Sequence, residues 1–169
     1  MIGWIIIMVA LVTVDQVTKI MAVRLLGPGG SVEVIPGVFR FTYVENRGAA
    51  FGMLSEKRWV FMILSMVAIV ALLIYLWKFR PDSTLACMAI SMIIAGGVGN
   101  MLDRVYLGYV IDFLDFCAFP TLWMWVFNVA DVCVCVGGGL LMLWLVISMV
   151  ADLKKERAEK SSDKNNKAE

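Results

Sequence analysis

The sequence predicts an all-α membrane protein of four transmembrane helices with a small β element. Hydrophobic residues make up 61% of the 169 residues, well above the ~45–50% that is usual in soluble domains. Four long apolar runs approach the ~20 residues that a helix needs to cross the hydrocarbon core of a bilayer. One segment between two of these runs instead alternates β-branched and aromatic residues with polar ones, which is typical of short strands.

The first helix is the least regular of the four, because Asp15 and Lys19 interrupt its apolar run. No Lys or Arg precedes that run, which favours a retained helix over a cleaved signal peptide. The other three runs are uncharged over nearly their whole length. The expected spans are residues 4–24, 59–77, 85–103 and 128–150, within one membrane domain of residues 1–151.

The loops between the spans differ greatly in length, and the first is the longest. It carries segments 31–35 and 38–44, split by Pro36 and Gly37, which predicts two strands joined by a turn. The second loop is short. After the last span, residues 152–169 are polar and of mixed charge, and we expect a cytoplasmic tail that is disordered beyond its first turns.

The distribution of positive charge predicts the orientation. Eight Lys and Arg residues fall in the short loop and the tail, which lie on the same side of the membrane as both termini. Since Lys and Arg concentrate on the cytoplasmic side of membrane proteins, both termini are expected in the cytoplasm.

Composition also excludes several kinds of chemistry. The chain has no histidine, which excludes Ser-His-Asp and Cys-His hydrolases and His-ligated metal sites. A net charge of +1 gives nucleic acid no basic surface to bind. The four cysteines form no Cys-x-x-Cys pair and are expected to be small apolar residues, with no metal and no cofactor. Whether Cys117 is oxidised stays open.

Polar residues gather where three of the helices approach one membrane face. Within each helix their spacing is i, i+3 or i+4, so each group shares one stripe, and ionisable groups inside a membrane segment usually indicate function. The alternative is that pairs such as Asp15–Lys19 and Asp103–Arg104 only lock the helices together. The groups are Asp15, Thr18 and Lys19; Asn100, Asp103 and Arg104; and Asn128 and Asp131.

Two carboxylates stand out because no cation lies within one helical turn of them in sequence. Asp112 follows Val110-Ile111 in the third loop, and Asp131 lies about one turn into the fourth span. Two neighbouring carboxylates can share one proton and act as general acid and general base. Alternatively, Asp131 is a helix-terminal acid and Asp112 a loop acid. Asp115 competes with Asp112 for the same role, and spacing does not choose between them.

Five motifs in this order resemble those of the lipoprotein signal peptidases, the type II signal peptidases of bacteria. No single motif is specific, but together they cover residues 1–151. They are Asp15-Gln16-Val17-Thr18-Lys19, Asn46-Arg47-Gly48-Ala49-Ala50-Phe51, Gly99-Asn100-Met101-Leu102-Asp103-Arg104, Val110-Ile111-Asp112-Phe113 and Phe127-Asn128-Val129-Ala130-Asp131.

The resemblance implies an aspartic endopeptidase of the bacterial cytoplasmic (inner) membrane. Such an enzyme cleaves diacylglyceryl-modified prolipoproteins before the lipidated cysteine, at the extracytoplasmic face, where the family has a β-cradle. We expect prolipoproteins and membrane lipid as partners and a monomeric enzyme. The resemblance gives the catalytic roles to Asp112 and Asp131 rather than Asp115. The positions it implies for substrate binding or support of the site are Asp15, Lys19, Asn46, Gly48, Asn100, Asp103, Arg104 and Asn128.

Two other classes of function stay open at this stage. A small proton-coupled transporter would suit four spans and a membrane carboxylate, but transporter sites usually lie near the bilayer midplane. A Ser-Lys hydrolase would need Lys19 beside a serine, and Ser55 is the loop serine nearest that face.

Overall fold

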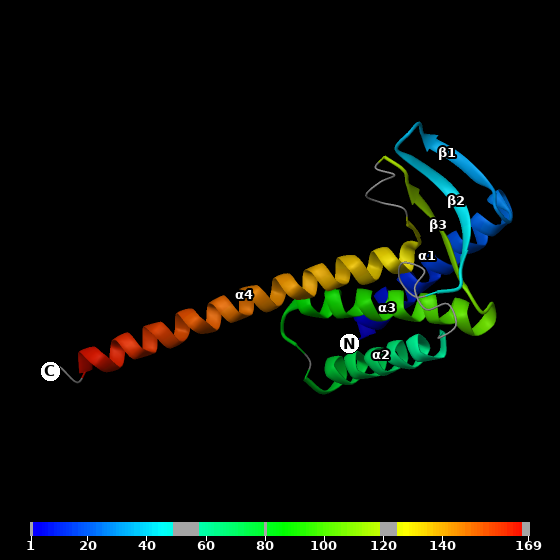
Figure 1. Ribbon diagram of the computed structural model, residues 1–169. Coiled ribbons are helices and arrows are strands. Elements are labelled where there is room, and N and C mark those ends of the chain that lie inside the picture. Colours follow the sequence, from blue (N-terminus) through cyan, green and yellow to red (C-terminus); the bar gives the residue numbers. More distant parts are fainter. Residues whose placement is uncertain (1, 49–57, 80, 119–124, 167–169) are drawn as a thin grey trace.

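The structure is a computed structural model that describes residues 2–48, 58–79, 81–118 and 125–166. Its four long helices are α1 (Ile2–Leu26), α2 (Arg58–Phe79), α3 (Thr84–Tyr106) and α4 (Val129–Asn166). A small sheet caps one end of the helices, and α4 extends far beyond their other end (Figure 1). The predicted fold class, a helical membrane protein with a small β element, is confirmed.

Four helices of the described chain are long and apolar enough to cross a membrane: Ile2–Leu26, Met62–Phe79, Thr84–Tyr106 and Val129–Arg157. Their outer faces carry large apolar side chains, such as Ile63, which is 61% exposed, and Val67, also 61% exposed. Such a surface is stable against lipid and costly against water. The small buried core lies between the helices, around Leu76, Ile90 and Ile94.

Helices α3 and α4 approach each other closely because both carry glycine at the contact. A Cβ on Gly96 would lie 2.3 Å from the backbone oxygen of Ala130, and one on Gly137 would lie 2.8 Å from that of Ala89. Within a membrane, small residues allow helix backbones to pack closely where a side chain would hold them apart. This contact fixes the start of α4 against α3.

The sheet has four antiparallel strands in the order β1-β2-β3-β4. Strands β1 (Ser31–Ile35) and β2 (Phe39–Asn46) are the predicted hairpin, and Gly37 takes a φ of 69° in its turn. Strands β3 (Val110–Phe116) and β4 (Val126–Phe127) were not expected from the sequence. Gly108, with a φ of 84°, turns the chain from the end of α3 into β3. A side chain would strain this backbone conformation.

Two differences from the sequence prediction concern long segments. Residues 110–116, expected as loop, form the interior strand β3, because β2 supplies a hydrogen-bonding partner that is distant in sequence. Helix α4 continues through the polar residues 152–166, where disorder was expected. Ala, Glu and Lys favour helix, and Glu156 and Lys160 lie one turn apart with their charged groups 3.9 Å from each other.

Candidate active site

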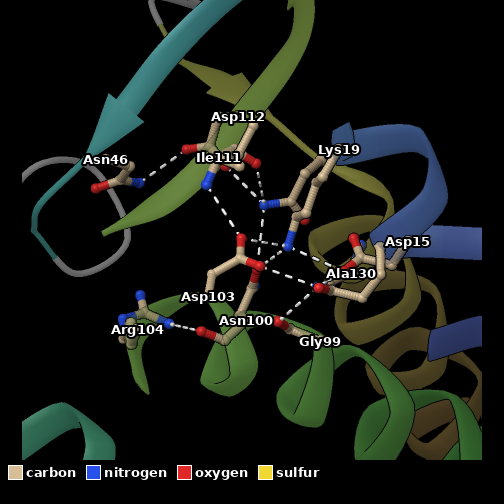
Figure 2. Close-up of polar contacts among 12 residues, drawn as sticks. Asp15, Lys19, Asn46, Gly99, Asn100, Asp103, Arg104, Ile111, Asp112 and Ala130 are labelled. Atoms are coloured by element: carbon tan, nitrogen blue, oxygen red, sulfur yellow. Dashed lines mark hydrogen bonds and ion pairs between the residues drawn. The ribbon is translucent and has the colours of Figure 1, made fainter. Parts of the chain in front are cut away.

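A buried polar cluster lies where the sheet meets the ends of α1, α3 and α4 (Figure 2). The predicted convergence of polar residues from three helices is therefore observed. Strand β3 adds Asp112 to the cluster and the end of β2 adds Asn46. The buried polar and charged members are Asp15, Lys19, Asp103, Asp112 and Asn128, each no more than 3% exposed.

Lys19 of α1 forms the charged centre of this cluster. Its Nζ lies 2.9 Å from Asp15 Oδ2 and 2.9 Å from Asp103 Oδ2, and it donates to Asn100 Oδ1 at 3.1 Å. The Asp15–Lys19 pair considered from the sequence is thus present. The salt bridge of Asp103 is made with Lys19 of another helix, whereas Arg104 donates to the backbone oxygen of Asn100 at 3.2 Å.

Asp15 links α1 to the start of α4. Its Oδ1 accepts a hydrogen bond from the backbone N–H of Ala130 at 2.8 Å. The first N–H groups of a helix lack partners within the helix, so an acceptor from a neighbouring helix stabilises the helix start. Asp15 therefore helps to fix the turn of α4 that carries Asp131.

Asp112 takes its orientation from the sheet register. It lies opposite Val44, while Asn46 lies opposite Val110, so Asp112 and Asn46 are diagonal neighbours on one face of the sheet. Asn46 Nδ2 donates to Asp112 Oδ2 at 2.9 Å, and Asn128 Nδ2 donates to Asp112 Oδ1 at 2.6 Å. Both oxygens of this carboxyl group therefore have a donor.

Asp131 is held by the same asparagine and by α3. Asn128 donates its backbone N–H to Asp131 Oδ2 at 3.1 Å, and Asn100 Nδ2 donates to Asp131 Oδ1 at 2.7 Å. Since Asn128 binds both carboxyl groups, Asp112 and Asp131 share one site although they lie on different elements.

The environment of Asp112 differs from that of a surface carboxyl. Burial and then the negative charge of Asp131 raise the pKa of Asp112 to about 7. The amides of Asn46 and Asn128 and the charge of Lys19 act in the opposite direction. A carboxyl group with this pKa holds its proton up to near-neutral pH and can act as a general acid there.

Asp115 does not join the site. Because side chains alternate along a strand, residues three positions apart point to opposite faces. Asp115 forms a salt bridge with Arg40, its direct partner on β2, and accepts a hydrogen bond from Thr42 at 2.9 Å. The structure thus separates the two acids that sequence spacing could not distinguish.

A cavity of about 560 Å³ opens beside Asp112 and Asp131 and continues between α2, α3 and α4. Near the two acids it is lined by Asn46, Asn100 and Arg104, and further along almost entirely by apolar side chains. These include Met62, Met101, Val132, Val134 and Val136. An elongated, mostly apolar ligand with a polar centre beside the carboxyl groups would suit this cavity.

Two contributors to the site were not predicted from the sequence, Gln16 and the backbone N–H of Ile111. Gln16 Nε2 donates to Asp103 Oδ1 at 2.9 Å and to the backbone oxygen of Gly99 at 3.2 Å. In the sequence, only its position next to Asp15 could have indicated that Gln16 belongs to the site. The backbone N–H of Ile111, which donates to Asp103 Oδ2 at 3.1 Å, has no signal in the sequence.

Of the remaining residues named from the sequence, the structure describes some and not others. Gly48 contributes its backbone N–H, which donates to Asn46 Oδ1 at 3.1 Å. Ala49, Ala50, Phe51 and Ser55 lie outside the described residues. Among the residues that the structure does describe, no group of three or more His, Cys, Asp or Glu side chains could hold a metal ion.

Comparison with known proteins points to one family. Residues 7–147 match the family described as "Signal peptidase (SPase) II". The lipoprotein signal peptidase of Caldanaerobacter subterraneus subsp. tengcongensis is 45% identical over 143 residues, which cover 83% of this chain and 95% of that protein. The lipoprotein signal peptidase of Halothermothrix orenii is 40% identical over 140 residues, covering 83% of this chain and 92% of that protein.

Solved structures agree with the fold. Two structures described as bacterial membrane enzymes, determined by the in meso method, superpose with TM-scores of 0.80 and 0.76 at 35% and 36% identity. They cover 87% and 85% of this chain, and the chain covers 89% and 92% of theirs. The similarity in fold thus extends over most of the chain.

Proposed function

Because the chain belongs to the signal peptidase II family of aspartic peptidases, we propose that it removes the signal peptides of diacylglyceryl-modified bacterial prolipoproteins and cleaves before the lipidated cysteine. The observation that carries the mechanism is the pairing of Asp112 and Asp131 around Asn128. Every group in this arrangement belongs to one chain, so a monomer suffices.

The two carboxyl groups divide the chemistry between them. Asp112, whose pKa is raised to about 7, holds the shared proton, and Asp131 is the ionised base. Asp131 takes a proton from water as the water oxygen attacks the scissile carbonyl carbon, and Asp112 gives its proton to the carbonyl oxygen. As the tetrahedral intermediate collapses, the proton on Asp131 passes to the leaving nitrogen, and a hydroxyl proton returns to Asp112.

The amides beside the pair supply the orientation that this chemistry needs. Asn46, Asn100 and Asn128 present N–H donors to the two carboxyl groups, which limits their rotation. A fixed geometry lowers the barrier because little reorganisation is left for the reaction step.

The cavity supports the proposed substrate class. Its apolar length between α2, α3 and α4 can take acyl chains, and Arg104 at the polar end can donate to carbonyl oxygens of the substrate. We place this end at the extracytoplasmic face, with both termini in the cytoplasm, on the strength of the Lys and Arg distribution.

A cleavage assay tests this proposal. Purified enzyme in detergent is given a lipidated prolipoprotein peptide, and wild type is compared with Asp112→Asn and Asp131→Asn. Since a positioned general acid or base contributes about 10²- to 10⁴-fold, each variant is expected to lose at least about 10²-fold in rate. Asp115→Asn is the matched control: it lies on the same strand as Asp112, points to the other face and should retain cleavage.

Two results would contradict the proposal. Full cleavage by Asp112→Asn or Asp131→Asn would exclude the two-aspartate mechanism. Equal cleavage of the same peptide without its lipid would exclude lipid recognition by the cavity.

A further inference from the structure

Lys19 occupies the centre of the site, yet the proposed chemistry gives it no step. Its side chain is 2% exposed, and its three acceptors are Asp15, Asp103 and Asn100. An ammonium group has three N–H donors and no acceptor. One of these donors pairs with Asp15 on the same helix, one joins α1 to α3 through the salt bridge with Asp103, and the third reaches the uncharged amide oxygen of Asn100 on α3.

That third hydrogen bond decides which way the Asn100 amide faces. Because an ammonium can only donate, the atom next to Lys19 Nζ has to be the oxygen Oδ1, and Nδ2 is turned away. The turned-away Nδ2 is the atom that donates to Asp131 Oδ1 at 2.7 Å. A reversed Asn100 amide would place its N–H₂ group against the ammonium and its oxygen against the Asp131 carboxylate.

The same oxygen also connects Lys19 with the other acid. Asn100 Oδ1 accepts a second hydrogen bond, from Asn128 Nδ2 at 3.1 Å, and that nitrogen donates to Asp112 Oδ1 at 2.6 Å. The side-chain path from Lys19 to either carboxyl group thus runs through Asn100, whereas Asp15 and Asp103 connect Lys19 to backbone N–H groups, those of Ala130 and Ile111.

We propose that Lys19 is a positioning residue for the Asp112–Asp131 pair, and that it acts through the Asn100 amide in addition to holding α1 against α3. This inference rests on the proposed function, since it concerns the geometry of the same two acids. It predicts that loss of Lys19 slows the chemical step more than a loss of stability accounts for.

The first experiment separates positioning from stability. Lys19→Met removes the ammonium, and Leu76→Ala, a buried site on α2 outside the polar cluster, lowers stability alone. At a temperature where thermal unfolding shows both variants folded, Lys19→Met is expected to lower kcat about 10- to 100-fold, since a small misplacement of reacting groups costs up to about 10²-fold. Its KM should stay within about two-fold of wild type, and Leu76→Ala should retain wild-type kcat.

The second experiment asks whether Lys19 acts through Asn100. In a double-mutant cycle, residues that act through one contact show non-additive losses. Lys19→Met is therefore expected to change kcat by less than about two-fold when introduced into Asn100→Ala. Losses that multiply would show that Lys19 acts without the amide, and would overturn the proposal.

The outcomes remain distinguishable if single substitution of Lys19 prevents folding. The triple variant Asp15→Asn/Lys19→Met/Asp103→Asn, which also removes the two charges that Lys19 pairs with, then replaces Lys19→Met in both experiments, and Asp15→Asn/Asp103→Asn, which keeps Lys19, replaces wild type as its reference. Wild-type kcat in a folded variant without Lys19 overturns the positioning role alone. Absence of cleavage by wild type overturns the proposed function itself.

Discussion

The hydrogen bond from Asn46 influences the pKa of Asp112. Its amide donates to Asp112 Oδ2 at 2.9 Å and so favours the ionised form of this carboxyl group. Burial and the charge of Asp131 outweigh it and raise the pKa of Asp112 to about 7. In the proposed mechanism Asp112 must hold a proton to act as the acid, so wild-type activity is expected to fall as the pH rises through about 7.

Asn46→Ala should move this decline to higher pH. Loss of a donor to the ionised form raises the pKa of Asp112 further, and a hydrogen bond to a charged group corresponds to about one pH unit. The measurement is kcat/KM against pH, which reports the groups of the free enzyme.

Thr42→Ala provides the matched control for this titration. Thr42 lies on the same strand, but its hydroxyl donates to Asp115. The decline of kcat/KM should therefore stay at the wild-type pH in Thr42→Ala. An unchanged pH profile in Asn46→Ala would show that Asp112 does not set the pH at which kcat/KM declines.

At the level of the elements, the site depends on how closely α3 lies to α1 and α4. A Cβ on Gly99 would lie 2.5 Å from Asp15 Oδ2 and 3.2 Å from the Cβ of Ala130. Gly99 also precedes Asn100, which contacts Lys19 and Asp131. A side chain at this position therefore displaces the elements that carry the polar cluster.

Gly99→Ala is expected to destabilise the protein by about 1–3 kcal/mol, as overpacking of a tight contact does, and to reduce cleavage. Gly138→Ala is the matched control, because a Cβ there meets nothing within 4 Å and alanine favours helix. Thermal unfolding in detergent and the cleavage rate measure the two effects. Equal Tm and rate for both variants would refute this account of the α3 contacts.

Strand β3 is the element that distinguishes the acids. If residues 110–116 formed a loop, Asp112 and Asp115 would be equally good candidates for the acid that pairs with Asp131. Pairing of β3 with β2 fixes the faces: Asp112 points toward Asn128, and Asp115 pairs with Arg40 across the strands. The pairing of β3 with β2 therefore determines which of the two acids lies beside Asn128.

For the whole molecule, the sheet and the polar cluster lie at one end of the helices, and α4 leads the C-terminus away from the other end (Figure 1). Helices α1 and α3 run toward the sheet, and α4 begins beside it. The cluster therefore belongs to one membrane face, which the proposed orientation makes the extracytoplasmic one.

Cysteine labelling in intact cells tests this orientation. With the other cysteines replaced by alanine, Cys117, which directly follows β3 and is partly exposed, should react with a membrane-impermeant maleimide. Asp82→Cys, at an exposed position in the α2–α3 loop, combined with Cys117→Ala, should react only after permeabilisation. The reverse pattern would place the site in the cytoplasm.

From the sequence alone, the four apolar helices, the first hairpin and the gathering of polar residues at one end of the helices could be predicted. These features follow from apolar run length, strand alternation and connectivity, which are local or additive properties of the chain. The family resemblance indicated Asp112 over Asp115 on motifs, without a physical reason for the choice.

The contacts among the polar groups, in contrast, could be seen only once the helices and strands were placed in three dimensions. The pairing of Asp103 with Lys19, the bond from Asp15 to the start of α4 and the formation of β3 each join residues of different elements. Local spacing holds no information on such contacts, because they depend on how closely the helices pack and on the register between strands. The site forms because buried donors and acceptors need hydrogen-bond partners, and in this protein those partners come from distant parts of the chain.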